Sequence, residues 1–102
     1  MYVQVTPSDV TLEDPSNFKQ FHVAVRGAAV DVGAALASSG FGSMDGNDAM
    51  ISVEAVRSAA AGRVGEGWEA GFEAMLEFAA TKGWLSEDGR AVRAHVEPVA
   101  AN

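Results

Sequence analysis

The sequence predicts a small α+β domain in which about three helices pack on a short antiparallel sheet that includes a C-terminal β-hairpin. Three observations support this fold class. Apolar and polar residues alternate in segments at both ends of the chain, an amphipathic segment covers 67–82, and an Asp-Gly pair stands at 88–89. A chain of 102 residues has room for one hydrophobic core, so we expect a single domain over 1–102.

The first 17 residues are expected to form an edge strand and a loop. Apolar and polar residues alternate over 2–5, and Pro7 ends this alternation, which suits a short strand at the edge of a sheet. Residues 8–17 are rich in turn formers and acidic residues, and this composition predicts a loop.

Residues 18–39 allow two interpretations. In the first, the whole segment is one helix. In the second, a strand over 19–26 precedes a helix over 28–38. We favour the second because β-branched and aromatic residues alternate with other residues in the strand segment. In addition, Gly27 and Gly33 would each cost about 1 kcal/mol inside a single helix.

The middle of the chain predicts a loop followed by a short helix. The composition of residues 40–48 is typical of a loop, and 50–53 forms either a very short strand or the lead-in to a helix. Ser52 is a suitable N-cap for a helix over 53–61, which Gly62 would end.

The clearest helix covers residues 67–82. At 100° per residue, its large apolar side chains fall on one stripe about 100° wide, as expected of a helix that faces a core. These side chains belong to Trp68, Phe72, Met75, Leu76 and Ala79. Together with Trp84, the three largest of them (Trp68, Phe72 and Leu76) should be the most buried large residues.

Residues 84–96 predict a β-hairpin with Asp88-Gly89 at its turn, where glycine supplies the positive φ. In its second strand, Val92 and the apolar residues at alternate positions should share one face. Pro98 is expected to close this strand, so that residues 98–102 form a frayed tail.

Charge and composition exclude several functions. The formal net charge of −7 disfavours a nucleic-acid partner or an anionic membrane surface, both of which attract basic faces. Without cysteine the chain has no disulfide framework and no thiolate nucleophile. No apolar run approaches the ~18 residues that a membrane span needs, so we expect a cytoplasmic protein. The dominance of Ala and Val, with Ile51 as the only isoleucine, is typical of a GC-rich bacterial genome.

His22, His95 and Glu97 are candidates for acid–base chemistry or metal binding. If their two strands pair, the imidazoles would be neighbours, with Glu97 and Arg93 beside them. We favour a simpler interpretation, in which both histidines are half-exposed on a solvated sheet face, because their spacing matches no known ligand pattern. No metal and no cofactor are therefore expected.

An aromatic-lined pocket for a small ligand is a further alternative. Its walls would come from Phe18, Phe21, Phe41, Trp68 and Trp84. A small core built largely of Ala and Val leaves little volume for a cavity of the ~300 Å³ that ligands need. This argument disfavours a ligand-binding role.

The favoured hypothesis is protein association through the exposed flank of the helix over 67–82. Phe78 falls outside the core stripe, beside the small residues Gly71 and Ala74, and this arrangement permits close approach of another surface. A charged rim would come from Glu69, Glu73 and Glu77. We therefore expect a small acidic protein without catalysis, which forms a homo-oligomer or binds a basic protein.

Overall fold

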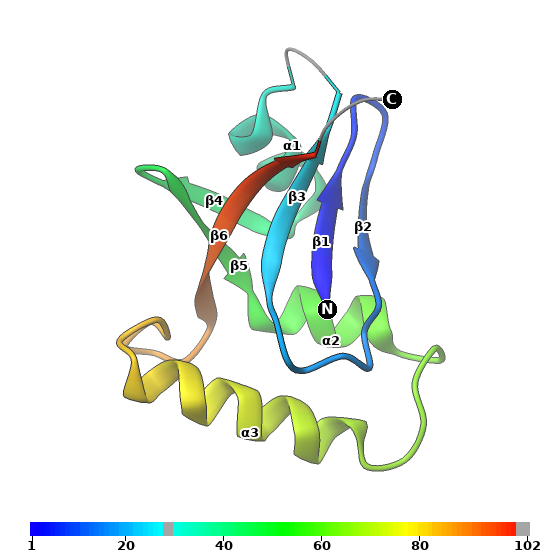
Figure 1. Cartoon of the computed structure of the whole chain (residues 1–102), viewed down its shortest axis with the longest axis vertical. Coiled ribbons are helices and arrows are strands. Elements are labelled where there is room, and N and C mark those ends of the chain that lie inside the picture. Colours follow the sequence, from blue (N-terminus) through cyan, green and yellow to red (C-terminus); the bar gives the residue numbers. More distant parts are fainter. Residues whose placement is uncertain (28–29, 100–102) are drawn as a thin grey trace.

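The computed structural model describes residues 1–27 and 30–99. Its framework is a six-stranded mixed sheet that curls into a half-barrel, with the strand order β2-β1-β3-β6-β5-β4 (Figure 1). The strands are β1 (Tyr2–Val5), β2 (Val10–Glu13), β3 (His22–Arg26), β4 (Gly42–Asp45), β5 (Asp48–Ser52) and β6 (Ala91–Val99). The helices are α1 (Val32–Ser39), α2 (Val53–Ala60) and α3 (Trp68–Thr81).

The predicted fold class, three helices on a short antiparallel sheet, is wrong. Strands dominate the structure, and two adjacent pairs of the sheet, β1 with β3 and β3 with β6, are parallel. The other three pairs, β1 with β2, β4 with β5 and β5 with β6, are antiparallel. Parallel neighbours need long connections, and local sequence patterns carry no signal for such pairing. The chain runs from β1 to β3 through β2, and from β3 to β6 through the segment that contains α1, α2 and α3.

The first strand of the predicted C-terminal hairpin is reduced to an isolated bridge. Four residues, Lys82 to Leu85, remain between the end of α3 and the turn at 86–90, and Leu85 bridges Val92. The backbone N–H of Arg93 donates to the carbonyl of Trp84, and that of Ser86 to the carbonyl of Ala91. β6 instead pairs with β3 and β5. The turn itself is confirmed, because Gly89 has a φ of +72°. β6 includes Pro98 and Val99, which belong to the expected frayed tail, and residues 100–102 lie outside the described residues.

The N-terminal region forms a hairpin instead of an edge strand and a loop. β1 occupies an interior position, and the segment expected to be a loop contains the edge strand β2. The turn between them is held by Thr6, whose backbone N–H donates to the carbonyl of Asp9 at 2.9 Å. Its hydroxyl also donates to the Asp9 carboxylate at 2.7 Å. Pro7 therefore lies in a turn between two paired strands.

The strand-then-helix interpretation of residues 18–39 is confirmed by β3 and α1. The expected helix start at residue 28 lies outside the described residues, and α1 begins after Asp31, whose carboxylate accepts a hydrogen bond from the N–H of Ala34. Gly40 ends α1 with a φ of +78°, and its N–H donates to the carbonyls of Ala37 and Leu36.

The loop expected over 40–48 contains a hairpin, β4 and β5, joined by Gly46 and Asn47. Gly42 allows the two backbones to approach, because a Cβ at this position would lie 2.0 Å from the carbonyl oxygen of Met50. The predicted N-cap of the next helix is confirmed, since the Ser52 hydroxyl accepts a hydrogen bond from the N–H of Ala55.

The core lies between the sheet and the helices. The sheet face that packs against α1 and α2, here called the inner face, carries apolar side chains that are at most 2% exposed. They are Val3, Val5, Leu12, Val23, Ala49, Ile51, Val92 and Ala94. α3 crosses one end of the sheet, below α2 and the loop between β2 and β3 (Figure 1).

The helical phase predicted for α3 is confirmed at Trp68, Phe72 and Leu76, which are all buried. The expected burial of Trp84 is wrong, because its side chain is 43% exposed. Trp84 lies three residues after the end of α3 at Thr81 and lines a groove at the surface. Among the described residues, no helix combines the length and the apolar character needed to cross a membrane.

Candidate functional site

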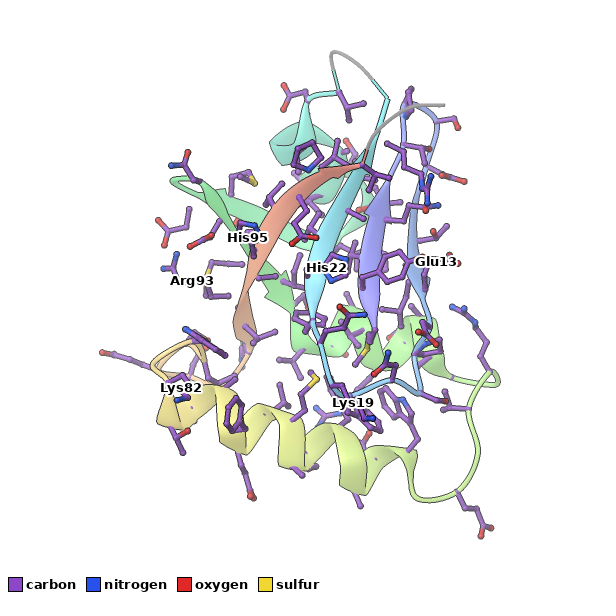
Figure 2. All side chains as sticks on the ribbon, viewed as in Figure 1. Glu13, Lys19, His22, Lys82, Arg93 and His95 are labelled. Carbon is purple, nitrogen blue, oxygen red and sulfur yellow. The ribbon has the colours of Figure 1, made fainter. Side chains whose placement is uncertain are left out.

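The opposite face of the sheet, here called the outer face, carries a row of titratable side chains. The strand register aligns one such residue from every strand, and directly paired residues point to the same face of a sheet. In spatial order the row is Glu13, Tyr2, His22, His95, Asp48 and Asp45. Figure 2 shows three of them, Glu13, His22 and His95, spread across the sheet.

The centre of this row brings together the three residues of the acid–base hypothesis. His22 and His95 are direct partners in the parallel pairing of β3 and β6, as expected if their strands paired. The Glu97 carboxylate lies between them, 3.9 Å from Nε2 of His22 and 3.8 Å from Nε2 of His95. The Tyr2 ring stacks on the His22 ring with centroids 5.1 Å apart. Two imidazoles therefore share one carboxylate on an accessible surface.

These three side chains differ in their exposure. The His22 side chain is 19% exposed, between Tyr2 and the neighbouring strand, whereas the His95 side chain is 68% exposed and that of Glu97 is 54% exposed. Among residues 1–27 and 30–99, no group of three His, Asp or Glu side chains is placed to hold a metal ion. Imidazole and carboxylate groups at a surface are able to exchange protons or to contact a charged group.

A groove of about 410 Å³ opens between this part of the outer face and α3. One wall is apolar and consists of Phe18, Phe21, Met75, Phe78 and Trp84. The other wall is polar and consists of Lys19, His22, Arg93, His95 and Glu97. A smaller hollow of about 220 Å³ shares Phe21, Trp84, Arg93 and His95 and extends the groove toward Asp48.

Two aromatic side chains on the apolar wall are exposed. Phe78 is 56% exposed and Trp84 is 43% exposed, and their rings meet edge to face with centroids 6.1 Å apart. The ammonium group of Lys82 lies 5.5 Å from the centre of the Phe78 ring. Large aromatic side chains left in contact with water beside a hollow are typical of a binding site.

Arg93 on the polar wall is held by carboxylates of the neighbouring hairpin. Its guanidinium donates to Asp45 at 2.6 Å and to Asp48 at 3.2 Å. These hydrogen bonds, first that to Asp45 and then that to Asp48, raise the pKa of Arg93 above its ordinary value. The arrangement fixes the guanidinium at the rim of the groove and uses two of its five N–H donors.

The residues of the association hypothesis are divided among different surroundings. Gly71 is packed against Phe18 of the same chain, since a Cβ at Gly71 would lie 2.5 Å from that ring. Glu69 and Glu73 both form ion pairs with Arg57 of α2. Ala74, Glu77 and Phe78 are exposed, and Phe78 belongs to the groove.

The residues of the aromatic-pocket hypothesis also separate into two groups. Phe18, Phe21 and Trp84 line the groove, whereas Phe41 and Trp68 are buried in the core. The Trp68 indole N–H donates to the carbonyl of Pro15 at 2.7 Å. The argument that a small core leaves little volume does not apply to this groove, because the groove lies outside the core, between α3 and the outer face.

Sequence reasoning missed Lys19 and Lys82, and it assigned Phe78 to a different kind of surface. Lys19 follows Phe18 directly, so their adjacency was visible, but nothing local indicates that α3 lies against this segment. None of the protein-family models matches the sequence, and no similar protein is found among the curated proteins or the solved structures.

Proposed function

We propose that the chain binds a small, largely apolar molecule in the groove between the outer face and α3. The observation that carries the proposal is the exposed pair Phe78 and Trp84 at a hollow of about 410 Å³. This volume lies within the range of roughly 300–1,000 Å³ that is typical of ligand sites.

The composition of the groove supports the same proposal. An apolar wall with a few convergent polar groups is the usual design of a small-molecule site, since the apolar wall supplies affinity and the polar groups fix orientation. Here Phe78 and Trp84 line the same groove as the imidazoles of His22 and His95 and the carboxylate of Glu97. A ligand that covers the two aromatic rings would remove apolar surface from water, worth roughly 25 cal/mol per Å².

An NMR titration with a neutral aromatic probe, indole-3-acetamide, tests this proposal. The indole N–H resonance of Trp84 should shift on binding. That of Trp68 should stay in place, because this N–H is already bonded to the carbonyl of Pro15 in the core. Trp68 is therefore an internal control within the same spectrum.

A matched pair of variants makes the test specific. Phe78→Ala should weaken binding of the probe by roughly 5- to 10-fold, because it removes one ring of the exposed pair. Met44→Ala removes an exposed apolar side chain from β4, away from the groove, and should leave binding unchanged. Equal shifts of both tryptophans, or equal affinities of both variants, would contradict the proposal.

Self-association is a second candidate, favoured by the same exposed aromatic pair and by the exposed Ala74 on the same helix. In a twofold dimer, Phe78 of one copy would approach the other copy. The pairing of Glu69 and Glu73 with Arg57 reduces the repulsion between facing helices, so the dimer should depend only weakly on salt.

Light scattering over a range of protein concentrations separates the two candidates. Under self-association the apparent mass rises with concentration, and Phe78→Asp abolishes this rise. Under small-molecule binding the protein stays monomeric and the probe titration is positive. The cytoplasmic location and the bacterial origin expected from the composition stay predictions.

A further inference from the structure

The groove concentrates basic side chains in a protein whose net charge is −7. Lys19, Arg93 and both histidines line the groove, and Lys82 lies over the ring of Phe78, which also lines the groove. Figure 2 shows Lys19, His22, Arg93, His95 and Lys82 around the space above α3. The chain has only seven Lys and Arg residues and two histidines, so this gathering distinguishes the groove from the rest of the acidic surface.

The polar wall also contains a negatively charged side chain, the carboxylate of Glu97, beside both imidazoles. Each oxygen of the Glu97 carboxylate lies within 4 Å of one imidazole, yet both distances exceed that of a good hydrogen bond. The imidazoles can therefore contact a second carboxylate, and the 68% exposed His95 is open to it.

We infer that the ligand is a small carboxylate with an aromatic or apolar body, and that binding it takes up a proton at the imidazole pair His22 and His95. The inference rests on the proposed function, because it names the class of molecule that the groove would hold. The apolar body lies against Phe78 and Trp84, and the carboxylate meets the imidazoles on the opposite wall.

The sign of the pH dependence follows from the groups that face the imidazoles. His22 is faced by Tyr2 from β1, by Glu97 from β6 and by Lys19 from the preceding loop, and His95 by Glu97, Arg93 and Asp48. An additional carboxylate favours the protonated form of an imidazole, and histidine is the side chain type whose charge ordinarily changes between about pH 5 and about pH 8. Affinity for a carboxylate should therefore rise as the pH falls from about 8 to about 6.

The groove suits a singly charged carboxylate better than a phosphate. Phosphate sites typically use a free arginine fork or backbone N–H groups at a helix N-terminus. The charge of Arg93 is already paired with Asp45 and Asp48, and α3 turns its C-terminal half, with Met75 and Phe78, toward the groove.

Three probes of matched shape test the inference: indole-3-acetate, indole-3-acetamide and tryptamine. Dissociation constants come from the Trp84 indole shift at about pH 6 and about pH 8. At the lower pH the acetate should bind about tenfold more tightly than the amide, with tryptamine the weakest. The affinity of indole-3-acetate should be about 3- to 10-fold higher at about pH 6 than at about pH 8, whereas the affinity of the amide should be the same at both pH values.

Variants of the polar wall assign this pH dependence. His95→Gln should remove most of it while leaving amide binding intact. Glu97→Gln should strengthen acetate binding at about pH 8, because it removes the competing carboxylate when an ordinary imidazole is neutral. Glu87→Gln is the matched control, since it makes the same change in the exposed turn after α3, outside the groove.

The outcomes separate the inference from the proposed function. The inference is wrong if tryptamine or the amide binds more tightly than the acetate, if acetate binding is independent of pH, or if His95→Gln keeps the pH dependence. In these cases binding of the amide still supports the groove as a ligand site. If none of the three probes shifts the Trp84 resonance, the proposed function fails, and the inference fails with it.

Discussion

The two faces of the sheet differ in what their side chains do. On the inner face, residues such as Ala49 and Ile51 are fully buried, and they belong to one core with α1 and α2. On the outer face of the same strand, Asp48 and Met50 are only half-buried. Alternate residues of a single strand therefore serve different purposes: those on the inner face stabilise the core, and those on the outer face form a chemically varied surface.

This difference teaches where the chain tolerates change. Removing atoms from the inner face leaves a cavity in a packed core, whereas the outer face has solvent beside it. The row across the outer face, including His22 and His95, can therefore be altered to test function without unfolding the protein. Variants of the inner face test the fold.

The largest expected effect is that of Ile51→Ala, on the inner face. It should lower the free energy of unfolding by about 2–5 kcal/mol, because the side chain is completely buried. The neighbouring variant Met50→Ala, on the outer face, should cost well under half of that loss. Chemical denaturation of both variants measures the difference, and equal losses would contradict the assignment of the two faces.

The second prediction concerns how β4 reaches β5 and places Asp45 and Asp48 beside Arg93. Gly42→Ala should destabilise the protein by about 1–3 kcal/mol, because the new methyl group would lie 2.0 Å from the Met50 carbonyl oxygen. Gly46→Ala, in the turn of this hairpin, has open space around it and should cost only about 1 kcal/mol, through its φ of +64°.

Loss of the close contact between β4 at Gly42 and β5 should also change the outer face. If β4 separates from β5, the ion pair between Asp45 and Arg93 is lost, and the Arg93 side chain should become more mobile in NMR relaxation. Gly46→Ala should leave this ion pair in place. A Gly42→Ala variant as stable as the parent would show that β4 does not approach β5 in this way.

Local patterns could predict α3 and the N-cap of α2. The stripe from Trp68 to Ala79 depends only on the helical period, and the capping of α2 by Ser52 depends on residues three positions apart. The hairpin of β4 and β5 had a signal as well, the pair Gly46-Asn47 between two short segments, but its Gly- and Asp-rich composition indicates a loop equally well.

The parallel pairs of the sheet could not be predicted in this way. The pairing of β3 with β6 joins His22 to His95, and no residue near either one specifies the other as a partner. Alternation alone placed both histidines on the polar faces of their strands, so their proximity was predictable once pairing was assumed. The groove was not, because it depends on α3 crossing the end of the sheet and on the exposure of Phe78 and Trp84 there.

The smallest expected effect concerns the turn that leads into β6 and sets where the outer-face residues of that strand begin. The Asp88 carboxylate accepts hydrogen bonds from the Ser86 hydroxyl at 2.7 Å and from the N–H of Arg90 at 3.0 Å. The hydrogen bond from Ser86, followed by that from Arg90, lowers the pKa of Asp88 below its ordinary value.

A carboxylate whose pKa is lower in the folded state stabilises the fold above its unfolded-state pKa, and this stability is lost as the pH falls through the folded-state pKa. Asp88→Asn should therefore lower the melting temperature slightly at about pH 7, and the difference from the parent should shrink below about pH 4. The carboxylate is fully exposed, so water screens the effect and keeps it small. Glu87→Asn, at the adjacent exposed position, should show no such pH-dependent difference. If the difference in melting temperature between Asp88→Asn and the parent grew in acid, the negative charge of Asp88 would destabilise the turn, and this prediction would be wrong.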